Sequence, residues 1–137
     1  MKRPSMPYEI NIEGNGTKII TRYYGVLTIS DIFAALEERF SDVERTRKCR
    51  IFLSDFTDVT ETRLGDLDVR SLTVNYKEAS SDNPDVIAVA VVPRDLLYGL
   101  GRMWEVYVES TDIPWKVEIV RTREEAQALI DEYNANR

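Results

Sequence analysis

The sequence contains no histidine and a single cysteine, Cys49, among its 137 residues. Histidine is the commonest general acid or base in proteins and the commonest metal ligand. Without histidine, one cysteine leaves too few ligands for a zinc site, and a lone cysteine cannot form an intramolecular disulfide. We therefore expect no zinc, no disulfide and no cofactor, and the position of Cys49 beside an apolar segment fits a reducing compartment.

Long hydrophobic runs are also absent. No apolar stretch approaches the ~20 residues needed to cross a bilayer, and residues 1–5 lead into no signal-peptide core. A cytoplasmic protein without an integral membrane segment is therefore expected. The net charge of −6 opposes attraction to phosphate backbones and to anionic membranes, so nucleic acid is not an expected partner.

Hydrophobic periodicity divides the chain into alternating strands and helices. Strands are predicted at residues 8–12, 18–24, 50–55, 86–92 and 116–120. Helices are predicted at residues 29–43, 64–79, 95–110 and 122–133. The order β-β-α-β-α-β-α-β-α predicts one α/β domain over residues 1–137, with a mostly parallel sheet and an N-terminal antiparallel hairpin.

Several local signals refine this prediction. The run from Val86 to Val92 has no polar residue, which is typical of a central strand covered on both faces. Residues 116–120 alternate as an edge strand does. Thr28 and Thr122 are each followed three residues later by an acidic residue, which indicates helix capping boxes, and Asp95 is a candidate N-cap.

Asp55 is the best-placed acidic residue, because it follows a predicted central strand and ligands bind at that end of open α/β sheets. With Asp58 and Glu61 it could form a magnesium site; alternatively, these acids cap and solvate a loop predicted at residues 56–63. No catalytic or nucleotide-binding motif is present, so we expect a protein that is not an enzyme.

Four basic residues lie within six positions of an otherwise acidic chain. This segment could meet an anionic headgroup or an acidic partner, or it could be a solvated connection. The residues are Arg45, Arg47, Lys48 and Arg50.

Gly99 and Gly101 lie inside the predicted helix 95–110, where each costs about 1 kcal/mol relative to alanine. The two positions point to nearly opposite sides of a helix. One glycine could permit close approach to the sheet and the other approach to a ligand or to a second copy of the chain, forming a homodimer. Arg102 and Glu105, three residues apart, predict a local ion pair.

The element order, together with residues 91–103 (Val-Val-Pro-Arg-Asp-Leu-Leu-Tyr-Gly-Leu-Gly-Arg-Met), resembles SpoIIAA-like proteins of the STAS superfamily. Residues 117–120 and 124–126 match the family's usual ending, and the resemblance extends from about Tyr8 to Tyr133. It implies a regulatory or sensory binding module that acts through an unknown protein partner. Residues 56–63 and the adjoining helix would then be the recognition surface.

Anti-sigma-factor antagonists of this superfamily carry a phosphorylatable serine after the central strand. The corresponding stretch here begins at Asp55 and lacks that motif; Thr57, Thr60 and Thr62 are its hydroxyl-bearing residues. The resemblance also extends in fold to CRAL-TRIO lipid carriers, so the alternative is a carrier or sensor of a small apolar ligand. The candidate ligand- or partner-binding residues are Phe56, Leu72, Tyr76, Tyr98, Gly99, Gly101 and Trp104.

Overall fold

The computed structural model describes residues 7–136 of the chain. Five strands and five α-helices follow one another there, with a short 3₁₀ turn, η1 (Gly14–Gly16), between the first two strands. The strands are β1 (Tyr8–Glu13), β2 (Lys18–Leu27), β3 (Ile51–Thr62), β4 (Ile87–Val91) and β5 (Lys116–Val120). The helices are α1 (Ile29–Phe40), α2 (Val43–Lys48), α3 (Asp66–Asp82), α4 (Asp95–Glu109) and α5 (Arg123–Ala135).

The five strands form one sheet in the order β1-β2-β3-β4-β5. β1 and β2 pair antiparallel, and every later pair is parallel. The predicted α/β fold with a mostly parallel sheet and an initial hairpin is therefore confirmed. β4 lies between two strands, as its continuous apolar run predicts, and β5 lies at an edge.

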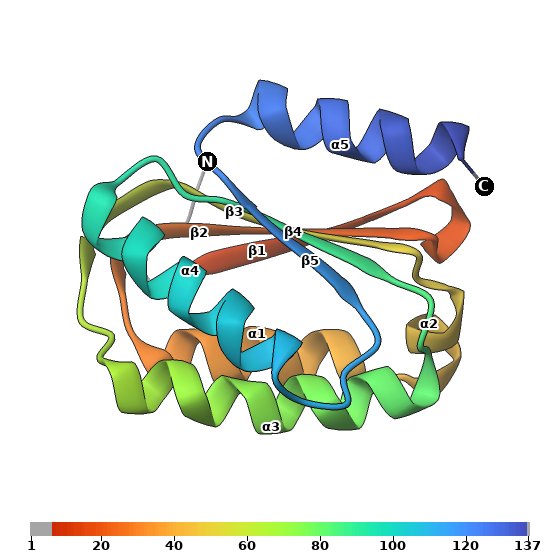
Figure 1. The fold of residues 1–137 in the computed structure, drawn as a ribbon, viewed down its shortest axis with the longest axis horizontal. Helices are drawn as coiled ribbons and strands as arrows, with labels where there is room; N and C mark the ends of the chain where they lie inside the picture. The colour runs from red at the N-terminus through yellow and green to blue at the C-terminus, as the bar shows by residue number, and fades with distance from the viewer. Residues whose placement is uncertain (1–6, 137) are drawn as a thin grey trace.

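The helices cover the two faces of the sheet unequally (Figure 1). α1, α3 and α4 lie together on one face, whereas α5 lies alone on the other. The larger core fills the space under the three helices. A smaller core lies beneath α5, where Ala126 and Ile130 pack on Ile51, Ile87 and Val89.

The predicted turns and caps account for the chain reversals. The hairpin turn contains Asn15 at φ 57° between two glycines that also have positive φ, a conformation that asparagine and glycine tolerate best. Thr28 accepts a hydrogen bond from the Asp31 backbone N–H, and Thr122 forms a complete capping box with Glu125. Arg94, and not Asp95, is the N-cap of α4, so the predicted role of Asp95 is wrong.

Two predicted loops are regular structure. Residues 56–62 continue β3, because β2 extends to Leu27 and pairs with this segment up to Thr62, while Val59 is buried in the main core. The basic segment begins in α2, which is capped by the Asp42 carboxylate. Among residues 7–136, no helix is long and apolar enough to cross a membrane.

Candidate functional site

An apolar cavity lies between the sheet and the helices of the three-helix face. Its floor is the middle of the sheet, where Ser54 pairs with Ala90 in register and Ala88 lies two residues before Ala90. Because successive side chains of a strand alternate between faces, Ala88 and Ala90 point to the same side. These three side chains are small, so they leave room that longer ones would fill.

Helices α3 and α4 form most of the rest of the cavity wall. Leu72 and Tyr76 of α3 and Leu97, Gly101 and Trp104 of α4 line it. The cavity volume is about 80 Å³. A single water needs about 10–15 Å³ of such space, so the cavity holds roughly six water-sized groups, the size of a small ring or a short alkyl chain.

The outer end of the cavity lies near the start of α3 and the side of α4. The lining residues there, Phe56, Leu64, Leu100 and Trp104, are only partly buried. Inside, polar groups are few. Trp104, one of the lining residues, has an indole Nε1 that is buried and has no hydrogen-bond partner among the described residues. A buried donor without an acceptor costs about 1–3 kcal/mol.

Of the seven candidate residues named from the sequence, five line this one cavity. They are Phe56, Leu72, Tyr76, Gly101 and Trp104. Tyr98 lies elsewhere on α4, where the Arg121 guanidinium stacks 3.8 Å from its ring centre. Gly99 is exposed on the outer side of α4, and a Cβ added to it would contact nothing within 4 Å.

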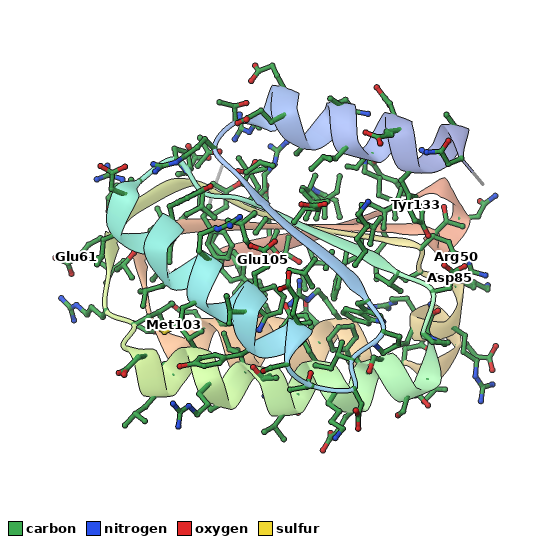
Figure 2. The ribbon with its side chains drawn as sticks, viewed as in Figure 1. Arg50, Glu61, Asp85, Met103, Glu105 and Tyr133 are labelled. Carbon is green, nitrogen blue, oxygen red and sulfur yellow. The ribbon has the colours of Figure 1, made fainter. Side chains whose placement is uncertain are left out.

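The two glycines of α4 therefore face opposite environments. A Cβ at Gly101 would lie 3.2 Å from Cγ2 of Ile119, closer than van der Waals contact. Gly101 thus lets α4 approach β5, and it lies directly at the cavity. The neighbouring pair on this helix, Arg102 and Glu105, forms the predicted ion pair at 2.9 Å. Burial raises the pKa of Glu105, and the charge of Arg102 opposes the shift. Figure 2 labels Glu105 on this helix.

Asp55 lies on the opposite face of the sheet, beneath the start of α5. It is buried, and its carboxylate accepts hydrogen bonds from the backbone and hydroxyl of Thr57 and, at 2.8 Å, from Nε of Arg123. Burial alone would raise its pKa, but these hydrogen bonds outweigh burial and lower it. Arg123 also lies 3.7 Å from Asp58. No cluster of three metal-ligating side chains occurs in the described part of the chain.

Two of the four basic residues of α2 and its exit, Arg47 and Arg50, pair with local acids. Arg47 lies 3.5 Å from Glu44, and Arg50 lies 3.8 Å from Asp85. Figure 2 shows Arg50 and Asp85 beside Tyr133 of α5, whose hydroxyl lies 3.4 Å from Asp85. This cluster joins the end of α5 to the starts of β3 and β4.

Sequence reasoning missed Arg39, which is fully buried in α1. Its Nη1 donates to Oγ1 of Thr21 at 3.0 Å, and its guanidinium carbon lies 4.2 Å from the ring centre of Phe52. The signal was present, because Arg39 follows Ile32 and Leu36 at seven and three residues and so shares their buried helical stripe.

Comparison with models of known protein families finds no match to this chain. No curated protein is significantly similar to it in sequence. The fold and the site together define an α/β domain with an apolar cavity between its sheet and helices α3 and α4.

Proposed function

We propose that this domain is a non-catalytic carrier or sensor that binds a small apolar molecule in the cavity between the sheet and helices α3 and α4. The observation that carries the proposal is the cavity itself, about 80 Å³ in volume and lined almost wholly by apolar side chains. Protein interiors contain few voids larger than one water. A ligand that fills this space would remove its apolar lining from water, which favours binding.

Filling the cavity from the protein side tests this function. Ala90→Leu adds three carbon atoms on the floor, about half of the available room. We expect the wild-type protein to bind 1-hexanol saturably in isothermal titration calorimetry, and the variant to lose at least about tenfold in affinity while its melting temperature stays equal or rises. Hexanol binding that is unchanged in the variant would contradict the proposal.

We also propose that the chain is a SpoIIAA-like member of the STAS superfamily that works in the cytoplasm. The support is the alternation of elements after an initial hairpin, together with the Tyr98 to Met103 segment. The helix α2 is an addition to the order expected from the sequence. Gene neighbourhood tests this assignment: adjacent genes for a sigma factor, kinase or phosphatase would support a signalling role.

A second candidate function is recognition of another protein, here a second copy of the chain. The observation in its favour is an apolar stripe on the outer side of α4, where Leu96 and Val106 are 68% and 60% exposed. Gly99 and Met103 lie between them at helical spacing. A glycine without neighbours on that stripe leaves space for close approach of a partner helix.

Gly99→Ala tests whether this stripe forms a homodimer contact, because the variant should affect helix stability and self-association differently. Alanine stabilises a helix interior by about 1 kcal/mol relative to glycine. The new methyl group would have no heavy atom within 4 Å, so urea unfolding should show that the variant is more stable by about this amount. If a homodimer forms here, light scattering should show weaker self-association of the variant. Unaltered self-association in Gly99→Ala and in Leu96→Asp would contradict the dimer. Hexanol binding should be unchanged, because Gly99 does not line the cavity.

A further inference from the structure

Arg39 is a buried cation, and only one of its three guanidinium nitrogens has a hydrogen-bond partner among residues 7–136. Its side chain is 0% exposed, and one hydrogen bond, from Nη1 to Thr21, is its only one within residues 7–136. Its Nε and Nη2 atoms are buried without any acceptor there. Arginine remains charged in proteins, and its guanidinium carries five N–H donors.

Among residues 7–136, no carboxylate accepts a hydrogen bond from Arg39 or forms an ion pair with it. The side chains that sense the charge of Arg39 include Tyr8, Tyr23 and Cys49. Burial raises the pKa of both tyrosines and raises that of Cys49 to about 11, so all three are neutral at pH 7. Leaving a buried charge unpaired is strongly unfavourable, whereas an apolar side chain of similar length would pack here without that penalty. Packing alone therefore does not explain an arginine at this position.

The guanidinium is separated from the cavity by one layer of side chains: Arg39 does not line the cavity, but it stacks on Phe52, which does. Thr21, which accepts its hydrogen bond, pairs with Ser54 in the β2–β3 register, and Ser54 lines the cavity. Adjacent strands are about 4.8 Å apart, so Thr21, to which the cation donates, lies roughly one strand spacing from Ser54 on the cavity floor. Two other lining residues flank this place: Phe52, against which the guanidinium stacks, and Tyr23, two residues after Thr21 on the same face.

We propose that the ligand of the cavity is a small amphipathic acid, whose carboxylate binds Arg39 and whose alkyl or aryl part fills the apolar space. This inference rests on the proposed binding function. The carboxylate would accept from the two unpartnered nitrogens of Arg39, Nε and Nη2, which lie on one edge of the planar group and suit a carboxylate with two parallel hydrogen bonds. Tyr23 and Ser54 also line the cavity, and burial raises the pKa of Tyr23, so both hydroxyls are neutral donors in its wall.

The comparison of hexanoate with 1-hexanol tests this inference, because the two probes share an alkyl chain and differ in the head group. We expect calorimetry at pH 7 to show that the wild-type protein binds hexanoate at least about tenfold more tightly, as one charge-assisted hydrogen bond would give. Arg39→Met should bind hexanol as the wild type does, lose the preference for hexanoate, and melt at a higher temperature without ligand. The control Arg47→Met, at an exposed position on α2, should keep the preference.

The outcomes separate the inference from the function on which it rests. If the wild-type protein binds hexanol, Ala90→Leu abolishes that binding and hexanoate is not preferred, the binding function stands and the proposal of an acidic ligand is wrong. A preference that survives in Arg39→Met would also overturn it. Binding of neither probe to the wild-type protein would overturn both. The wild-type comparison needs no variant, so the inference stays testable even if Arg39→Met does not fold.

Discussion

Replacing Asn83 with alanine is expected to lower the free energy of unfolding by about 3 kcal/mol, because several buried backbone groups lose their partner together. Asn83 is 4% exposed and follows α3. Its Nδ2 donates to the carbonyls of Thr46, Arg47 and Cys49 at the end of α2, and its Oδ1 accepts from the Asp85 backbone N–H. Urea unfolding followed by circular dichroism at pH 7 measures the loss.

The matched control for this prediction is Asn11→Ala, at an exposed position of β1, which should change stability by less than about 0.5 kcal/mol. A loss below about 1 kcal/mol for Asn83→Ala would mean that water replaces the amide at the carbonyls. Asn83 would then not be what holds α2 against the end of α3.

Asp55→Asn is expected to lower the free energy of unfolding by about 2 kcal/mol at pH 7, because Arg123 and Arg22 lose their buried counter-charge. Arg123 is about half exposed, and solvent screening keeps the loss below that of a fully buried pair. The pKa of Asp55 is lowered in the folded protein. Its contribution is therefore present above the unfolded pKa of about 3.9 and is lost as the pH falls through the folded value.

The stability difference between the wild type and Asp55→Asn should consequently shrink when unfolding is measured at successively lower pH below about 4. Asp58→Asn is the control, since Asp58 is half exposed and 3.7 Å from Arg123, and it should cost less than about 0.5 kcal/mol. If the difference in unfolding free energy between the wild type and Asp55→Asn does not depend on pH, the charge of Asp55 does not contribute to stability.

Much of the fold was predictable because buried apolar residues recur at regular spacings along strands and helices. The unbroken apolar run around Val89 gave a central strand, and the threonine and acidic pairs at Thr28 and Thr122 marked two helix starts. The end of β3 was not predictable in this way, because its Thr- and Asp-rich residues resemble a loop and become a strand only through pairing with β2. The short helix α2 spans too few residues to show a helical period.

The candidate site was predictable in part for a related reason. Large apolar residues such as Tyr76 and Trp104 are natural candidates for a pocket, and the unusual Gly101 drew attention to the same helix. The cavity, however, exists because three small residues meet on one face of the sheet: Ser54 on β3, and Ala88 and Ala90 on the adjacent strand β4. Strand register decides which small residues meet, and no single segment of sequence contains that information.

The most direct test of the central claim is nuclear magnetic resonance of the ¹⁵N-labelled wild-type protein during a titration with 1-hexanol. If the cavity is the binding site, saturable shifts should concentrate on the backbone amides of Ser54, Ala88, Ala90 and Gly101 and on the indole N–H of Trp104. Shifts that do not saturate, or that lie only on the outer side of α4 around Leu96 and Val106, would contradict it.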